Sequence, residues 1–179
     1  MAKNNLIITK NDHAEIIIDS KKYGIKVVII DADDIDKCKE YNWYASRCTK
    51  EKYGFYIRGR KVGSKSLIGL HRLIMNFPPL NVDHINHNSL DNRKCNLRLA
   101  NSSENGQNKI KCQSNNKTSG IKNIHWNKEK SKWQVKITLN KITTHIGYYK
   151  DLEKAKEQAI KARKEYHLFS QETLNEDKI

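Results

Sequence analysis

An acidic residue, a histidine and two asparagines follow one another at fixed spacing near the middle of this chain. Asp83 and His84 are neighbours, Asn96 lies 12 residues after His84, and Asn105 lies nine residues after Asn96. Hydrolysis of a phosphodiester needs a water made nucleophilic and charge balanced on the scissile phosphate. A histidine of near-neutral pKa can act as the base, and a divalent ion held by carboxylate and amide oxygens can balance the charge. The pattern therefore indicates metal-assisted cutting of nucleic acid.

The charge of the chain agrees with such a substrate. The 179 residues carry a formal net charge of +14, of which residues 111–166 contribute +9 and residues 66–110 only +2. Basic segments beside a catalytic core favour docking on a phosphate backbone. The apolar runs are too short to cross a bilayer, and the N-terminus lacks the apolar core of a secretion signal. We therefore expect a cytoplasmic protein, favoured as a monomer, whose partner is double-stranded DNA and not a membrane.

The first third of the chain is typical of a β-rich region. Residues 15–20, 26–30 and 54–59 are rich in branched or aromatic side chains and lie between turn signals, which predicts strands. Acidic residues from Asp33 onward predict a short helical segment that runs toward Trp43. Residues 67–76 predict a second helix or an extended stretch, which Pro78 and Pro79 end.

The central segment predicts a strand, a loop, a second strand and a helix. Residues 82–85 form a short apolar run, 86–93 are polar with turn residues, and 96–100 alternate like a returning strand. Asn101 has the character of an N-cap, and Glu104 three residues later completes a capping box. Neighbours on a strand point to opposite faces, so Asp83 and His84 converge on one phosphate only if the strand bends at its end.

The C-terminal part predicts three strands and a helix after a polar linker at 111–118. Residues 132–140 place Trp133, Val135, Ile137 and Leu139 on one face and polar side chains on the other. Further strands are expected at 121–126 and 141–148. From 151 to 167 the apolar residues recur at helical spacing. Three antiparallel strands packed on one helix are the expected result.

Residues 70–110 resemble the HNH nuclease family with its ββα-metal fold, in the variant of phage and intron-encoded homing endonucleases. The short motifs Leu-Asp-Asn-Arg and Asn-Leu-Arg around the four residues are typical of this family. The resemblance implies that Asp83 and Asn105 bind Mg²⁺ or Mn²⁺ and that His84 is the general base. It implies that Asn96 braces the loop and orients the histidine. The paired zinc cysteines of many HNH enzymes are absent here.

Several neighbouring residues have more than one interpretation. Asn108, one turn after Asn105, is the alternative for the last metal position. His71 and Arg72 contact phosphate or serve packing, and Arg93 and Arg98 bind phosphates or lie on an exposed surface. A zinc site composed of His84, His87, Cys95 and Cys112 is a further alternative, although the cysteines form no paired motif.

Residues 118–167 resemble the Apetala-type, ethylene-response-factor DNA-binding domain. The resemblance rests on Ser119-Gly120-Ile121 through Trp126, on Lys132-Trp133-Gln134-Val135 and on Ile146-Gly147-Tyr148-Tyr149. That family lays a three-stranded sheet in the DNA major groove. The residues expected to contact DNA are Lys122, His125, Trp126, Lys132, Gln134, Lys136, Thr138, Thr143 and His145. Arginines are absent from these strands, which favours phosphate positioning or shape readout over strong base readout.

Together these inferences predict an α+β protein. It has a β-rich N-terminal region at 1–66, an HNH core at 67–110, the linker at 111–118, the DNA-binding domain at 119–167 and a tail at 168–179. The expected function is hydrolysis of double-stranded DNA with a divalent metal. The alternative is a non-catalytic DNA-binding regulator that keeps the nuclease scaffold. An RNA-binding module is disfavoured because no aromatic side chains cluster on a sheet to stack single-stranded bases.

Overall fold

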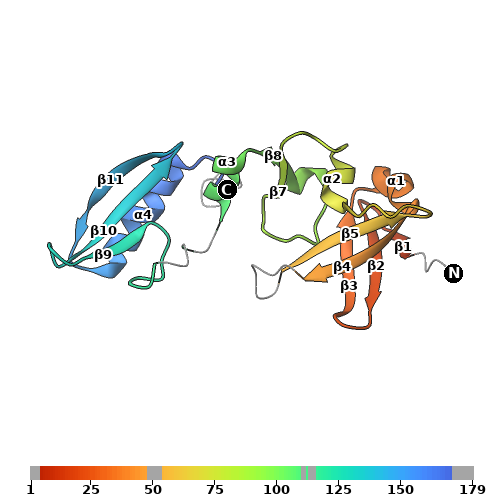
Figure 1. The fold of residues 1–179 in the computed structure, drawn as a ribbon, viewed down its shortest axis with the longest axis horizontal. Helices are drawn as coiled ribbons and strands as arrows, with labels where there is room; N and C mark the ends of the chain where they lie inside the picture. The colour runs from red at the N-terminus through yellow and green to blue at the C-terminus, as the bar shows by residue number, and fades with distance from the viewer. Residues whose placement is uncertain (1–4, 48–53, 110–111, 113–115, 171–179) are drawn as a thin grey trace. The chain divides into compact units, whose positions relative to one another are not determined.

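The computed structural model describes residues 5–47, 54–109, 112 and 116–170. They form small antiparallel sheets, short helices and one longer C-terminal helix (Figure 1), which confirms the mixed α+β class. The chain divides after Ala100 into two compact units, 1–100 and 101–179. Parts of the expected linker (111 and 113–115) and of the tail (171–179) lie outside the described residues. Among the described helices, none combines the length and the apolar character that a bilayer crossing requires.

The first unit begins with a three-stranded antiparallel sheet in the order β1-β2-β3. Its strands are β1 (Leu6–Thr9), β2 (Ala14–Ser20) and β3 (Gly24–Ile30). Alternate residues of β2, namely Ala14, Ile16 and Ile18, are buried, as the period of two in a half-buried strand requires. The strands expected at 15–20 and 26–30 are thus confirmed.

A short helical turn leads into the second sheet of this unit. The 3₁₀ turn η1 (Ala32–Asp34) and α1 (Ile35–Lys39) precede β4 (Tyr41–Arg47). The expected helix therefore stops at Lys39, and its continuation toward Trp43 was wrong. Trp43 is a fully buried strand residue whose Nε1–H donates to the Cys38 carbonyl at 3.0 Å. Burial of this large ring in the core outweighs the local helical pattern.

The second sheet is completed by β5 (Phe55–Lys61) and β6 (Ile68–Gly69), in the order β4-β5-β6, and α2 (Leu70–Ile74) follows directly. Gly59 on β5 faces Trp43 so closely that an added Cβ would lie 2.5 Å from the ring. A single hydrophobic core joins both sheets, α2 and a residue of a later strand. Its buried members include Ile16, Val28, Trp43, Ile57, Leu70, Leu73, Ile74 and Leu97. Residues on both sides of the expected boundary at 66/67 therefore share one core.

The first unit ends in a two-stranded hairpin, β7 (Asn81–His84) and β8 (Leu97–Ala100), with the 3₁₀ turn η2 (Lys94–Asn96) just before β8. Asn81 pairs with Ala100 and His84 with Leu97 in antiparallel register. Asp83 and His84 lie on β7, and the long loop between the strands ends at Asn96.

The second unit begins with α3 (Ser102–Asn108). Its Asn101 N-cap accepts from the Ser103 and Glu104 amides, and the Glu104 side chain accepts from the Asn101 amide, which confirms the capping box. Then β9 (Ile124–Asn127), β10 (Lys132–Leu139) and β11 (Ile142–Tyr149) form a sheet with β10 in the middle. The helix α4 (Leu152–Tyr166) packs on it through Ala155 and Ala159. The expected strands and helix are confirmed.

Candidate functional site

His84 is the last residue of β7 and lies buried, with 9% of its surface exposed. Its Nε2 is 3.2 Å from the Asn92 Oδ1. The Asn92 Nδ2 donates to the Ser89 carbonyl, which fixes the amide orientation and makes Oδ1 an acceptor. The His84 Nε2 therefore donates, and in the neutral ring the lone pair is at Nδ1. Burial lowers the pKa of His84, against the raising effects of the Asn92 hydrogen bond and of Asp83 and Asp91. This histidine is neutral at pH 7, as a general base must be.

His71 lies edge-on against His84, with ring centroids 5.5 Å apart. It is the second residue of α2, which begins directly after Gly69. A Cβ added at Gly69 would lie 2.8 Å from the His71 Cε1. Burial lowers the pKa of His71 to about 4, and the nearby charges of His84, Arg72 and Arg58 act in the same direction. His71 is thus a neutral neighbour of the candidate base, and the structure brings together two histidines that the sequence separates by 13 residues.

Asp83 and His84 leave their strand in opposite directions. Asp83 pairs with Arg98 across the hairpin, and the Arg98 Nε and Nη2 donate to the Asp83 Oδ2 at 3.2 and 3.0 Å. Both side chains are largely buried. The Asp83 carboxylate nevertheless acts on the His84 imidazole, whose pKa it raises. Arg98, expected as a phosphate ligand, here partners the expected metal ligand.

Asn96 joins the start and the middle of the loop between β7 and β8. Its Nδ2 donates to the Asp91 carbonyl at 2.7 Å, and its Oδ1 accepts from the Asn86 amide at 3.0 Å. The Asn86 Nδ2 reaches the Asp91 carboxylate at 3.3 Å. The Asn96 bond to the Asp91 carbonyl is buried and shielded from water, and its bond from the Asn86 amide is partly buried. These contacts have the geometry of the loop-bracing role implied by the family resemblance.

Asp91 and Asn92 are site residues to which the sequence analysis gave no role. Asp91 is buried and accepts from the Arg93 Nε and Nη2, each at 2.8 Å. This bidentate pair lowers the pKa of the Asp91 carboxyl and raises that of Arg93. The guanidinium of Arg93, expected to contact phosphate, is thus engaged inside the loop. The Leu-Asp-Asn-Arg motif was visible in the sequence, but only the fold shows that its asparagine contacts His84.

The N-terminal sheet anchors the loop. Ile29 on β3 donates its amide to the Leu90 carbonyl, and its own carbonyl accepts from the Asn92 amide, both at 2.8 Å. The Lys94 amide donates to the Asp31 carboxylate at 2.7 Å, and the Lys94 ammonium lies 2.7 Å from the buried Asp34 carboxylate. The residue that contacts His84 is therefore held through its backbone by a strand more than 60 residues earlier.

Two further residues in the loop region have structural contacts. The Arg72 guanidinium donates to the Pro78 carbonyl at 2.7 Å and to the Leu80 carbonyl at 3.2 Å, which ties α2 to the turn before β7. His87, at φ 62°, donates its amide to the His84 carbonyl at 3.1 Å. Arg72 was one of the expected phosphate contacts, and the observed contacts serve the packing alternative.

Asn105 and Asn108 lie on α3, in the second unit. Asn105 is half-buried and Asn108 is buried. The Lys122 ammonium donates to the Gln107 and Lys109 carbonyls at the end of this helix, both at 2.7 Å. Lys122, expected to touch DNA, thus caps the C-terminus of α3. The Lys122 carbonyl in turn accepts from the Arg163 Nη1 at 3.2 Å, which links the cap to α4.

The face of the C-terminal sheet opposite α4 carries most of the expected DNA contacts. Gln134 lies near its centre, and its Nε2 is 3.3 Å from the His145 Nδ1 and 3.0 Å from the Tyr148 hydroxyl. The cross-strand register pairs Gln134 with His125 on β9, and on β11 Lys136 with His145. The hydroxyls of Thr138 and Thr143 are 2.9 Å apart and exposed. Lys132, at the start of β10, is on the same side by alternation.

Trp126 lies on the other side of that sheet. It pairs with Trp133 across β9 and β10, with ring centroids 4.9 Å apart, and Trp133 packs against the core beneath α4. Trp126 is 37% exposed. It was expected to contact DNA, and the structure places it apart from Gln134, Lys136 and His145.

The donor chemistry of the expected metal ligands fits a hard divalent ion. A carboxylate at Asp83 and an amide oxygen at Asn105 are the oxygen ligands that Mg²⁺ prefers. Among the described residues, His, Cys, Asp and Glu side chains form no group of three or more that could hold a metal. Within the first unit, the other carboxylate near His84 belongs to Asp91, which is paired with Arg93.

The buried imidazole of His71 predicts a loss of stability in acid. Its folded pKa of about 4 lies below the unfolded value of 6.5, so the unfolded chain binds a proton that the folded chain does not. This contribution is fully present above pH 6.5 and is lost as the pH falls from 6.5 to 4, by about 3 kcal/mol for this group. Urea unfolding at several pH values should show the decline, and a His71→Asn variant should show a shallower one. Equal pH dependence in both proteins would contradict the assignment.

Comparisons of this chain with protein-family models, with curated proteins and with solved structures yield no match.

Proposed function

We propose that this protein is an HNH-type, homing-like DNA endonuclease that hydrolyses phosphodiester bonds of double-stranded DNA with Mg²⁺ or Mn²⁺. The observation that carries the proposal is the environment of His84. Burial keeps the imidazole neutral, and the Asn92 Oδ1 accepts a hydrogen bond from its Nε2–H. Asn96 fixes the loop that carries Asn92. A general base needs a neutral imidazole in a defined tautomer, and these contacts supply both.

The residues of this chain divide the chemistry among them. The Nδ1 of His84 accepts the proton of the attacking water, and Asn92 holds the tautomer that presents this lone pair. Asp83 and Asn105, with Asn108 as the alternative to Asn105, would hold the divalent ion. When bound, that ion balances the charge of the scissile phosphate and stabilises the leaving oxygen. The bidentate pair of Asp91 and Arg93 keeps the loop rigid during the reaction.

The second unit supplies the DNA affinity in this proposal. Gln134, Lys136, His145 and Thr138 lie on the sheet face that α4 leaves uncovered. The Lys130 ammonium lies 4.1 Å from the centre of the Tyr148 ring, and the Tyr148 hydroxyl accepts from the Gln134 amide. A cation therefore lies beside hydrogen-bonding side chains on this face. Such a face suits contacts to phosphates and base edges.

A plasmid assay tests the proposed activity. The purified protein should convert supercoiled plasmid to open circles or linear DNA with Mg²⁺ and should leave it intact with EDTA. An Asp83→Asn variant should need more Mg²⁺ for the same rate, because an amide lacks the carboxylate charge. Absence of any Mg²⁺-dependent product, on plasmids that include the natural target, would contradict the proposal.

One observation favours the alternative of a non-catalytic DNA-binding regulator. The Asp83 carboxylate, which would bind the metal, is paired with Arg98 in a largely buried contact. A regulator predicts that the protein binds duplex DNA equally well with Mg²⁺ and with EDTA and cuts it under neither condition. The plasmid assay therefore separates the two functions.

A further inference from the structure

The first unit has an exposed sheet face that contributes no residue to the site around His84. On β4 and β5, one set of alternating side chains points into the core, as Trp43 and Ile57 do. The other set points away from it, and cross-strand pairs join Tyr44 to Arg58 and Ser46 to Tyr56. We call this surface the β4–β5 outer face; its members are Tyr44, Ser46, Tyr56, Arg58 and Arg60.

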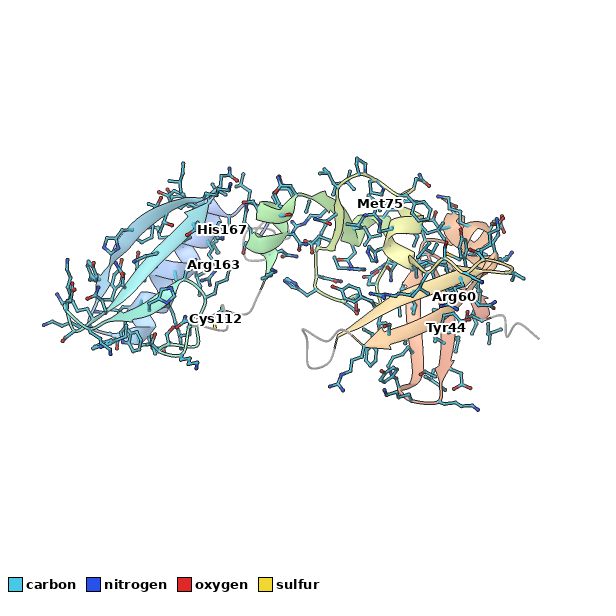
Figure 2. The ribbon with its side chains drawn as sticks, viewed as in Figure 1. Tyr44, Arg60, Met75, Cys112, Arg163 and His167 are labelled. Atoms are coloured by element: carbon cyan, nitrogen blue, oxygen red, sulfur yellow. The ribbon has the colours of Figure 1, made fainter. Side chains whose placement is uncertain are left out.

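Large aromatic rings are exposed on this face. Tyr44 is 50% exposed and Tyr56 is 40% exposed. Tyr44 and Arg60 extend from adjacent strands (Figure 2). Tyrosine combines an apolar ring with a hydroxyl donor, so exposed pairs of tyrosines mark surfaces that meet a partner.

The two arginines of the face have no acidic partner among the described residues. Arg58 and Arg60 are exposed and make no ion pair there, whereas Lys61, the next residue on β5, lies 2.7 Å from Glu40. A guanidinium offers a planar fork of donors that matches a phosphate. Two such groups at alternate positions of a strand, beside tyrosines and without a carboxylate on the face, are complementary to a phosphate backbone.

The face continues to the candidate catalytic histidine. The Tyr56 and His71 rings are 6.3 Å apart, and the His71 and His84 rings are 5.5 Å apart. Arg58 pairs with Gly69 on β6, and the missing side chain at Gly69 leaves the space that the His71 ring occupies. A phosphate chain that passes His84 would therefore meet Tyr56 and Arg58 next.

We propose that the β4–β5 outer face binds the backbone of duplex DNA beside the scissile phosphate. This surface belongs to the first unit and is separate in the chain from the C-terminal sheet. Arg58 and Arg60 each bind a phosphate, and Tyr44 and Tyr56 pack against the sugars. The position beside the scissile phosphate rests on the proposed nuclease function, whereas the binding of duplex DNA by this face does not.

The salt dependence of DNA binding by the full-length protein tests the inference. Each phosphate contact contributes about 0.9 to the slope of log K against log salt concentration. The R58Q/R60Q variant should therefore lower the magnitude of that slope by about two. The matched control is K39Q/K61Q, which removes two charges from exposed lysines that are paired with Asp36 and Glu40. The control should keep the wild-type slope.

A hydroxyl-radical footprint supplies the second measurement. In R58Q/R60Q, protection should be lost on one side of the cut site and kept over the region covered by the C-terminal sheet. If thermal melting shows that the double variant is unfolded, the single R60Q variant replaces it, with an expected slope change of about one. K61Q is its control.

The outcomes separate this inference from the proposed function. If the wild type nicks DNA and R58Q/R60Q keeps the wild-type slope and footprint, the inference fails and the nuclease proposal stands. If the wild type does not nick but the slope falls only in R58Q/R60Q, the DNA-binding face stands without the nuclease. An equal fall in the control, or equal competition by duplex RNA, would overturn the assignment to a duplex-DNA surface.

Discussion

Replacement of His84 by alanine should abolish Mg²⁺-dependent nicking while the protein still binds duplex DNA. General-base catalysis contributes about 10²–10⁴-fold to a rate, so single-turnover nicking should fall by at least about 100-fold. DNA affinity should change little, because His84 is not among the proposed DNA contacts, which are Gln134, Lys136 and their neighbours in the second unit and the β4–β5 outer face in the first. The rate is measured on supercoiled plasmid, and the affinity by gel shift on the same sequence.

A second substitution at His84 distinguishes loss of the base from unfolding of the protein. In His84→Gln, an amide replaces the imidazole at similar size and can still donate toward the Asn92 oxygen, but it cannot accept the proton of water. This variant should fold and bind DNA as the wild type does and should still fail to cut. Nicking by either variant at the wild-type rate would show that His84 is not the base.

Replacement of Asn96 by alanine should lower the stability of the first unit. The change removes the donor to the Asp91 carbonyl, a buried contact, and the acceptor for the Asn86 amide, a partly buried one. A buried group that loses its partner costs about 1–3 kcal/mol, and water can replace the partner of the partly buried Asn86 amide at a cost below about 1 kcal/mol. The unfolding free energy should therefore fall by about 1–4 kcal/mol. Urea unfolding measures this, and nicking should fall with it because the loop no longer holds Asn92 against His84.

The matched control for Asn96 lies in the same loop. Asn88 is exposed, and its Oδ1 accepts from the Leu90 amide at 3.1 Å. Because water can replace that partner, Asn88→Ala should cost less than about 1 kcal/mol. If Asn96→Ala lowered the unfolding free energy no more than Asn88→Ala does, the bracing role assigned to Asn96 would be contradicted.

Much of the fold could be predicted because its signals are local. The alternation of residues 132–140 gave β10 and its buried face, and Asn101 with Glu104 gave the start of α3. Trp43 shows where local signals fail. Its neighbours have a helical pattern, but burial of the ring against Gly59 places it in a strand. The tertiary contact outweighs the local preference.

The candidate site could be predicted only in part, because its second layer depends on long-range contacts. Asp83, His84 and Asn96 could be named from spacing, whereas the roles of Asn92 and His71 depend on how the loop and α2 pack. Lys122 illustrates the same point. Its type and position fit a DNA contact, but the end of α3 lies where its ammonium can reach two carbonyls. No local pattern in the sequence encodes that proximity.

The anchoring of the loop to β3 also determines when the surroundings of His84 form during folding. Ile29 must already be in its sheet before it can hold Leu90 and Asn92, and contacts this distant along the chain form late because closing the loop between them costs entropy. During synthesis the N-terminal strands emerge first, so His84 arrives at a platform that is already built. A chain cleaved between β3 and β7 would keep all four motif residues but would lose the strand that holds Asn92 beside His84.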